Sequence, residues 1–239
     1  MAAGAYSVAR AAGGGSNTVG DRYVVNQNDD VLRWARKTAK LNGSKVVAHW
    51  TMKDRRVVGA TAEGGPLAVH LLNWHGKGGL EVRFDLVQEH GGVPVGNPLF
   101  LRRLDSESAS ESINACSAMY ADLIEQLEQR PGTLPLLSSV IEHVWQRPEP
   151  TETNQKSQTR WKNRKDEITT IFQTSYEHNA LGVLTAVNEW AQYGRVFRGS
   201  GGDESVNTDL RAEETMFGQT RAIGVAAYKF LTTTTRGET

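Results

Sequence analysis

The stretch that decides the fold runs from Ser44 to Gln88 and reads SKVVAHWTMKDRRVVGATAEGGPLAVHLLNWHGKGGLEVRFDLVQ. It contains four apolar segments, which are separated by short turns rich in glycine, lysine and acidic residues. Gaps this short can join antiparallel strands, whereas parallel strands need a crossover connection of about a dozen residues. We therefore predict an antiparallel meander with four strands, at Ser44–Met52, Arg55–Ala62, Leu67–His75 and Leu80–Gln88.

The first and last strands of this meander alternate between two kinds of side chain. In the last strand, four apolar side chains face one way and three charged ones face the other: Leu80, Val82, Phe84 and Leu86 against Glu81, Arg83 and Asp85. An antiparallel sheet with this pattern buries one face and leaves the other in water. We expect the wet face to be available to a partner and the apolar face to be covered by a helix.

A long amphipathic helix is predicted after the meander and a fifth apolar segment, Pro98–Leu104. It starts in a serine- and glutamate-rich stretch with a capping box at Ser108–Glu111, and it ends at Arg130-Pro131-Gly132. Its apolar residues recur with the period of an α-helix, at Ile113, Cys116, Tyr120, Leu123, Ile124 and Leu127. We predict that the helix over Ser108–Gln129 packs on the sheet, which gives an α+β fold, an antiparallel β-meander on a long helix, followed by a C-terminal helical region.

The composition divides the rest of the chain around an α+β core at residues 21–146, which also includes a short helix after Asp29 or Asp30. Glycine-rich, proline-containing and threonine-rich segments mark the remaining boundaries. They predict a flexible arm at 1–20, a linker at 147–159, a helical region at 160–231 and a fraying tail at 232–239.

The overall composition constrains the partners and the compartment. The 239 residues carry 27 basic and 27 acidic side chains, so a nucleic-acid binder would need a local basic patch. The single cysteine, Cys116, excludes an intramolecular disulfide and indicates a reducing compartment. No apolar run approaches the roughly 20 residues of a membrane span, and the N-terminus lacks the apolar block of a signal peptide. We expect a soluble cytoplasmic protein without a membrane partner.

No motif for catalysis or metal binding emerges from the sequence. The six histidines and Cys116 show no zinc-ligand spacing, and the nucleophile motif Gly-x-Ser-x-Gly does not occur. Asp85, with Glu81 and Arg83 beside it, resembles the acidic strand of some metal-dependent nucleases, but a two-metal site needs further convergent carboxylates. We predict no catalytic residue, no metal and no cofactor, and we keep a nuclease as a weaker alternative.

Basic residues near exposed aromatic rings are the strongest functional signal. A basic groove with an aromatic platform holds single-stranded nucleic acid without reading its sequence. The first such group belongs to the sheet, its turns and its continuation: Lys53, Arg55, Arg56, Trp74, Lys77, Arg83, Arg102 and Arg103. The second surrounds Trp161 and comprises Arg160, Lys162, Arg164 and Lys165. These twelve residues are the predicted DNA-binding set.

Three segments resemble a phage- and plasmid-like domain-of-unknown-function family that is found in phages, prophages and plasmids. Tyr23–Asn28 is similar to its Tyr-x-Pro-x-Gln-Asn motif, with Val25 in place of the proline. Asn179–Trp190 is similar to its helix Thr-x-Trp-Gly-x-x-Asn-Ala-Val-Thr-Glu-Tyr, with Leu181 and Thr185 as departures. Arg211–Gly218 looks like its closing segment, Arg…Ser-x-x-Phe-Gly. The resemblance covers the chain from about Gly20 to about Phe230 and implies a bacterial host cell.

The family name records no activity, but its setting and its order of elements are similar to those of the ring-forming single-strand annealing proteins of the Rad-fifty-two and Red-beta type. This analogy implies a homo-oligomeric ring that binds single-stranded DNA and anneals it in phage recombination, without a nucleotide cofactor. A phage exonuclease or a single-strand-binding protein would be a further partner. The alternative from another class is a non-catalytic structural or interaction protein of a phage.

Overall fold

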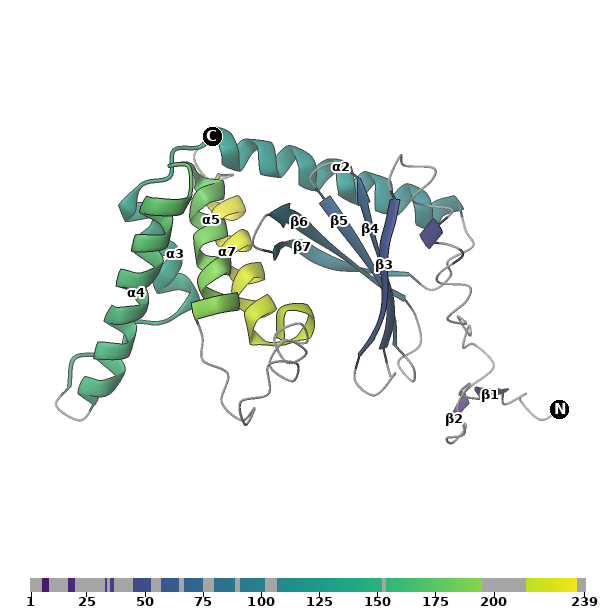
Figure 1. The fold of residues 1–239 in the computed structure, drawn as a ribbon, viewed down its shortest axis with the longest axis horizontal. Coiled ribbons are helices and arrows are strands. Elements are labelled where there is room, and N and C mark those ends of the chain that lie inside the picture. The colour runs from purple at the N-terminus through teal and green to yellow at the C-terminus, as the bar shows by residue number, and fades with distance from the viewer. Residues whose placement is uncertain are drawn as a thin grey trace. The chain divides into compact units, whose positions relative to one another are not determined.

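The chain has a mixed α+β fold that is mostly helical (Figure 1). The computed structural model describes residues 6–8, 17–19, 33, 35–36, 45–52, 57–64, 67–74, 80–88, 91–101, 107–151, 154–194 and 214–235. The predicted flexible arm lies outside these residues except for two short strands, β1 (Tyr6–Val8) and β2 (Asn17–Val19), which pair antiparallel. Most of the predicted first helix also lies outside them, although residues 33, 35 and 36 are helical and Ala35 is buried.

A second sheet contains the predicted meander. Its strands follow the sequence order β3-β4-β5-β6-β7. They are β3 (Lys45–Met52), β4 (Val57–Gly64), β5 (Leu67–Trp74), β6 (Leu80–Gln88) and β7 (Gly91–Leu101). The pairs β3–β4 and β4–β5 are antiparallel, so the prediction of an antiparallel meander is confirmed for these three strands. Each of the four predicted strand ranges agrees with the structure within two residues.

The charged side of strand β6 is buried, which differs from the prediction. Glu81 and Asp85 are only 7% and 2% exposed, so both faces of the strand are buried along most of its length. The expectation of a solvent-facing side is therefore wrong for β6. The physical reason is that each carboxylate has a cationic partner, which offsets the cost of burying its charge. Arg83 Nε donates to Glu81 Oε1 at 2.6 Å, and Arg221 Nη1 donates to Asp85 Oδ1 at 2.9 Å.

Within the described residues, the helices with defined bounds are five α-helices and one short π-helix. They are α2 (Glu107–Gln129), α3 (Leu134–Val144), α4 (Gln155–Ser175), α5 (Ala180–Glu189), η2 (Trp190–Gly194) and α7 (Gln219–Thr235). Residues 214–217 are helical as well, and Gly218 forms a bend before α7. The helical region predicted over residues 160–231 is therefore interrupted at Gly218.

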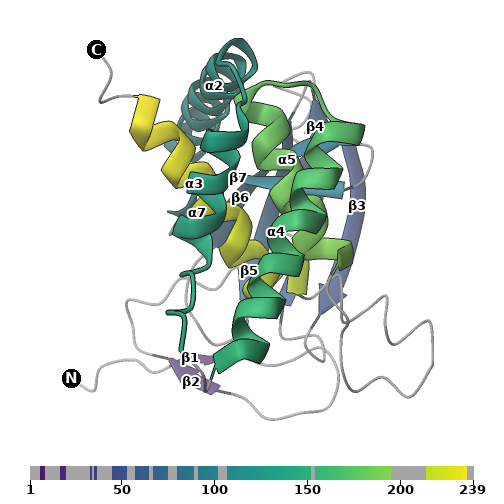
Figure 2. The same ribbon diagram turned by 90° about the vertical axis from the view of Figure 1, so that its left-hand side faces the viewer.

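Contacts within the chain define two compact units, residues 1–84 with 98–117, and residues 85–97 with 118–239. In the second unit α3 packs against α4, α5 and α7 (Figure 2). The predicted linker at 147–159 therefore separates no domains, because the helix before it packs on the helices after it. It is also shorter than predicted, since α4 begins at Gln155. Two prolines and a polar composition indicated an exposed segment but could not show that it is a turn within one unit.

The apolar stripe of α2 is buried as its period predicts, at Ala109, Ile113, Tyr120, Ile124 and Leu127. The proposed capping box is wrong, because Ser108 lies inside the first turn, where its carbonyl accepts a hydrogen bond from Ser112 Oγ. Within the second unit, Tyr120 packs edge to face on Tyr228 of α7, with ring centroids 6.4 Å apart. Its hydroxyl donates to the carbonyl of Asn97 in β7 at 3.3 Å.

Gly96 in β7 lies directly under the Tyr120 ring and has a φ of +70°. An added Cβ would lie 2.0 Å from Tyr120 Cζ, so alanine would meet both backbone strain and a clash with the ring. We expect Gly96→Ala to lower the free energy of unfolding by about 2–4 kcal/mol. Urea denaturation measures the effect, and Gly92→Ala, whose added Cβ would meet Asp85 at no closer than 3.0 Å, is the milder comparison. Equal stability of wild type and Gly96→Ala would contradict this packing.

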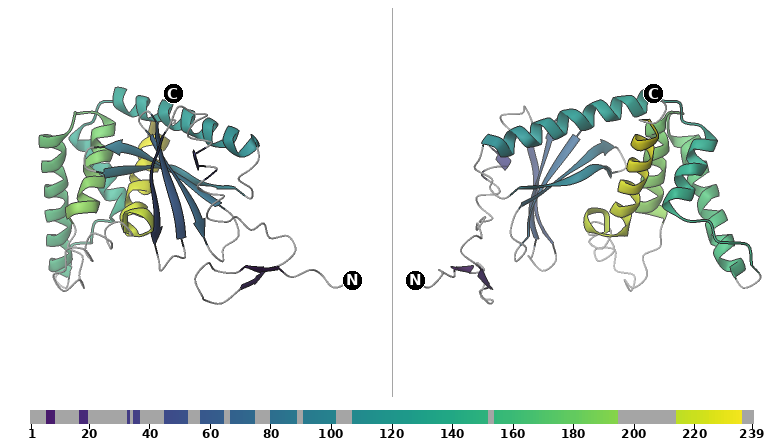
Figure 3. Two further views of the ribbon diagram at one scale, coloured as in Figure 1. Left: turned by 45° about the vertical axis from the view of Figure 1, so that its right-hand side comes forward. Right: turned by 180° about the vertical axis from the view of Figure 1, so that it is seen from behind.

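The C-terminal helices carry side-chain hydrogen bonds to the backbone near their ends. Asn179 Oδ1 accepts from the Gly182 amide at 2.7 Å and caps α5, whose residues are nearly all buried. Helix α7 continues to Thr235, so it includes residues 232–235 of the predicted tail, and the expectation that the tail frays stays a prediction. The hydroxyls of Thr232 and Thr233 bond back to the carbonyls of Tyr228 and Lys229, which satisfies them within the helix. Figure 3 shows α7 beside α5 in both views, as their contacts require.

Candidate nucleic-acid interface

The predicted DNA-binding residues of the sheet fall mostly outside the part of the chain that the structure describes. This holds for Lys53, Arg55, Arg56, Lys77, Arg102 and Arg103. Trp74 is the last residue of β5, where its backbone pairs with Val57 of β4, but its side chain is not among those described. For these residues the assignment to DNA binding stays a prediction.

Arg83 is the sheet cation whose surroundings are defined, and it does not project into solvent as predicted. Its side chain is 12% exposed, and its Nε lies 2.6 Å from Glu81 Oε1. A cation that is mostly buried and matched by a carboxylate would have to give up that partner to bind a phosphate. The local geometry therefore makes Arg83 a structural residue of β6.

The second predicted cluster lies on α4, which forms because one side of an otherwise polar sequence carries large apolar residues. Trp161, Ile168 and Phe172 recur at helical spacing and are buried. The residues between them remain outside the core, which leaves the long cationic side chains on the surface. Helix α4 therefore presents exposed cations at Lys156, Arg160 and Lys162.

Arg164 and Lys165 of the same cluster are turned toward neighbouring helices. The guanidinium carbon of Arg164 lies 4.8 Å from the centroid of the Trp145 ring and 5.1 Å from that of Trp190. Lys165 Nζ donates to Ser138 Oγ of α3 at 2.6 Å. Cation–π contacts and hydrogen bonds of this kind stabilise helix packing. The structure therefore divides the predicted cluster into two exposed cations, Arg160 and Lys162, and two that hold α4 in place.

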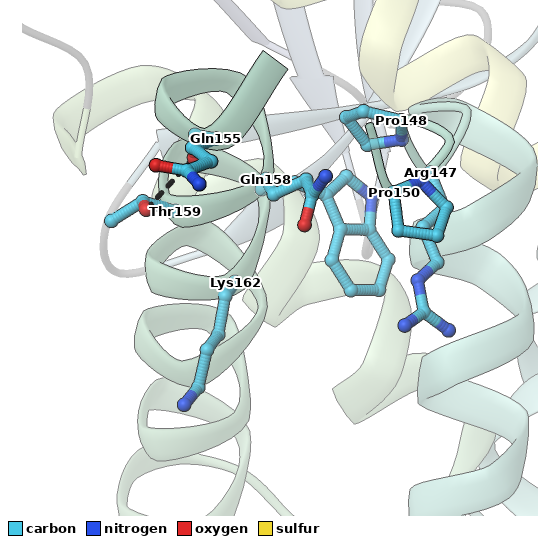
Figure 4. A pocket seen from close by; sticks show the side chains of 8 residues that line it. Arg147, Pro148, Pro150, Gln155, Gln158, Thr159 and Lys162 are labelled. Carbon is cyan, nitrogen blue, oxygen red and sulfur yellow. Dashed lines mark hydrogen bonds between the residues drawn. The ribbon is translucent and has the colours of Figure 1, made fainter. Parts of the chain in front are cut away.

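A groove of about 430 Å³ lies where the α3–α4 turn meets the first two turns of α4 (Figure 4). Trp161, which is 9% exposed, lines it, and its indole Nε1 donates to the Trp145 carbonyl at 3.1 Å. The guanidinium carbon of Arg147 lies 5.5 Å from the centroid of the Trp161 ring. Eight residues line the groove: Arg147, Pro148, Pro150, Gln155, Gln158, Thr159, Trp161 and Lys162.

Sequence reasoning missed Arg147, because it placed this residue in a linker. The signal that could have found it is local charge. From Arg147 to Lys165 the chain has six basic residues and two acidic ones, although the whole chain is neutral. Within the described part of the chain, no carboxylate pairs with the four exposed cations of this segment, Arg147, Lys156, Arg160 and Lys162. Two of these cations, Arg147 and Lys162, border the groove, and neither has a carboxylate partner among the described residues.

A buried polar cluster in the second unit joins the tip of β6–β7 to α7 and η2. Arg221 Nη1 donates to both oxygens of Asp85, at 2.9 and 3.2 Å. Gln192 Nε2 donates to the Gly92 carbonyl at 2.9 Å, and Thr220 Oγ1 donates to the Ala191 carbonyl at 3.3 Å. These bonds satisfy groups that would otherwise be costly to bury, so the cluster fixes the position of the strand tip.

The carboxylates of the nuclease alternative are engaged by arginines. Asp85 is bound by Arg221, and Glu81 is bound by Arg83. Across the residues with defined positions, no group of three or more histidines, cysteines, aspartates or glutamates could hold a metal ion. The local geometry of Asp85 is that of an ion-pair partner.

Cys116 lies on the predicted apolar stripe of α2 and is half-buried. Burial raises the pKa of its thiol above the ordinary value. A raised pKa means that less thiolate is present at a given pH, and thiolate is the reactive form. We expect Cys116 to react with iodoacetamide more slowly at pH 8 than an unstructured cysteine peptide does. A rate equal to that of the peptide, with the protein folded, would contradict this environment.

None of the helices in the described residues is long and apolar enough to cross a membrane. Comparison of the chain with known protein families, characterised proteins and solved structures yields no match. Function is therefore inferred from the residues of the groove and of α4.

Proposed function

We propose that this protein binds single-stranded DNA and anneals complementary strands, as a homo-oligomeric ring without a nucleotide cofactor. One observation carries the proposal. Arg147 and Lys162 are exposed, have no carboxylate partner within the described residues, and border a groove lined by a tryptophan, and Arg160 is a further exposed cation of α4. Exposed cations on one surface neutralise the phosphates of a single strand without reading its sequence.

Annealing requires that the backbone is neutralised while the bases stay accessible to a second strand. Exposed arginine and lysine side chains on one helix supply the first requirement, because they reach phosphates without enclosing the bases. The neutral total charge is compatible with this mechanism, since the positive charge between Arg147 and Lys165 is local. Binding should therefore depend on salt, as phosphate contacts release counterions.

Of the two predicted surfaces, the proposal favours α4 and the groove. Lys156, Arg160 and Lys162 are exposed, whereas Arg83 of the sheet is paired with Glu81. The sheet cations Arg55, Arg56 and their neighbours remain a predicted extension of the same path.

Self-association has separate support in exposed apolar side chains. Five large ones are between 44% and 72% exposed: Val87, Phe100, Met119, Leu134 and Tyr193. Exposed apolar side chains that form a contiguous patch are commonly covered in a symmetric homo-oligomer. We further propose that α2 covers the apolar face of the meander.

We also propose that the protein acts in phage recombination in a bacterial cytoplasm, together with an exonuclease or a single-strand-binding protein.

The test measures strand annealing and assembly together. Two complementary 40-nucleotide strands carry a fluorescence donor and acceptor, and their pairing is followed with and without the protein and without ATP or metal. We expect faster annealing with protein, and light scattering that reports a multimer at micromolar concentration. Unchanged annealing together with no oligonucleotide binding would favour the alternative of a structural or interaction protein. A nuclease would shorten the strands when Mg²⁺ is added.

A further inference from the structure

The groove at the α3–α4 turn has chemically different ends (Figure 4). The charged ends of Arg147 and Lys162 lie on its two sides toward one end. Pro148, Pro150 and the amide of Gln158 lie toward the other end. A ligand that matches this arrangement has an anionic part and a flat part with polar edges, which is the composition of a nucleotide.

The amide of Gln158 is held in one orientation. Its Nε2 donates to Asn154 Oδ1 at 2.6 Å and lies 3.3 and 3.5 Å from the carbonyls of Glu149 and Thr151. Three oxygen atoms surround the nitrogen, and they would repel the amide oxygen if the amide were flipped. The nitrogen of the amide is therefore the end that faces them. Gln158 therefore offers only its Oε1, an acceptor, to a ligand, and Figure 4 shows this oxygen directed toward the end of the groove with Arg147 and Lys162.

An acceptor fixed in this way discriminates between bases. Cytosine and adenine carry an exocyclic amino group that donates a hydrogen bond, whereas uracil and thymine present a carbonyl oxygen at the equivalent position of the pyrimidine. A carbonyl facing Gln158 Oε1 would place two acceptors together. Cytosine and adenine therefore satisfy Gln158 Oε1 with the amino group at this position, whereas uracil and thymine carry their donor on the adjacent ring nitrogen, N3, and would have to shift in the groove to use it.

Arg147 is also preorganised for a phosphate. Its guanidinium lies over the Trp161 ring, which restricts the side chain before a ligand arrives. Lys162 supplies a second cation from α4, and the 430 Å³ of the groove falls in the range of about 300–1,000 Å³ that is typical of small-molecule sites. The volume is sufficient for one nucleotide unit rather than for several.

We infer that the groove holds one nucleotide of the bound strand, with its phosphate between Arg147 and Lys162 and with a cytosine or adenine base donating its amino group to Gln158 Oε1. This inference rests on the proposed function, because the nucleotide belongs to a bound strand. It adds a base preference, which single-strand binding through phosphates and stacking alone does not require.

The experiment changes the ligand and leaves the protein intact. Fluorescence anisotropy compares 20-nucleotide strands of deoxycytidine and deoxyuridine, which share one backbone and differ at the amino group and the adjacent ring nitrogen. We expect the deoxycytidine strand to bind about three- to tenfold more tightly, as one hydrogen bond provides. Gln158→Met should remove the preference. The matched variant Gln155→Met, which changes the other amide of the groove, should keep it, and circular dichroism checks that both variants fold.

The outcomes separate this inference from the proposed function. If both strands bind equally well, or deoxyuridine binds better, the base preference is overturned while single-strand binding stands. If neither strand binds, the proposed function fails. Calorimetric titration with the mononucleotides dCMP and dUMP then tests, separately, whether the groove binds a nucleotide. Tighter binding of dCMP would then support a nucleotide site, and equal or undetectable binding of the two would overturn it.

Discussion

Asp85→Ala is expected to lower the free energy of unfolding by about 3–5 kcal/mol, because it leaves Arg221 as a buried charge without its partner. Asp85 and Arg221 are 2% and 9% exposed, and two hydrogen bonds of 2.9 and 3.2 Å join them. Water cannot readily replace the lost carboxylate at such a site. Urea denaturation followed by circular dichroism measures the change, with the slope against urea compared to ensure that the same surface unfolds.

The matched control removes a carboxylate from an exposed ion pair. Glu142 lies 3.9 Å from Lys165, and its side chain is 49% exposed, so Glu142→Ala should cost less than about 1 kcal/mol. The double variant Asp85→Leu with Arg221→Met should recover much of the loss, since apolar residues often replace a buried pair at little cost. If Asp85→Ala were as mild as Glu142→Ala, the tip of β6 would not be held by a buried ion pair.

Removing three exposed cations, Arg147→Ala, Arg160→Ala and Lys162→Ala together, is expected to weaken single-stranded DNA binding about a hundredfold at low salt. Each phosphate contact in water contributes about a factor of five. The plot of log affinity against log salt should also become shallower by about 2, since each contact contributes roughly 0.7 for single strands. Anisotropy titrations of a labelled oligonucleotide at four salt concentrations measure both effects.

A variant with the same loss of charge serves as the control. Arg33, Arg36 and Lys229 are exposed cations of other elements, and replacing all three by alanine lowers the net charge equally. This control should change affinity by less than fivefold and leave the salt slope nearly unchanged. Equal losses in the two triple variants would show that total charge, and not the surface of α4, determines binding.

The fold was predictable where local sequence chemistry decides the structure. Short connections left only antiparallel neighbours for β3, β4 and β5, and the 3.6-residue period marked the buried stripe of α2. Both signals depend on residues close together in the chain. The ends of helices were harder to predict. At the end of α7, the hydroxyls of Thr232 and Thr233 donate to carbonyls of the preceding turn, and the helix continues past its predicted end.

The burial of β6 could not be predicted, because its cause lies far away in the sequence. Asp85 looks like a solvent-facing residue by alternation, and its partner Arg221 is 136 residues further on. No pattern within the strand reveals such a partner. The same limit explains the error in the linker, since only the packing of α3 on α4, α5 and α7 shows that this turn lies within one unit.

The sequence predicted the location of the candidate site but not which of its cations are exposed. Composition identified the cations around Trp161, but it could not separate Arg160 and Lys162, which are exposed, from Arg164, whose guanidinium lies against two tryptophan rings. That separation depends on which way each residue of α4 faces and on what the adjacent helices place there. Arg147 was missed for the related reason that the chain turns back between α3 and α4.

Photo-crosslinking tests the central claim, which is that single-stranded DNA lies along α4 and the adjoining groove. A strand with 5-bromodeoxyuridine at alternate positions is irradiated in complex with the wild-type protein, and mass spectrometry identifies the attached peptides. If the strand lies along α4, we expect most crosslinks to fall between Arg147 and Lys165. Crosslinks confined to residues 53–56, 74–77 or 102–103 would contradict it and would place the strand on the sheet.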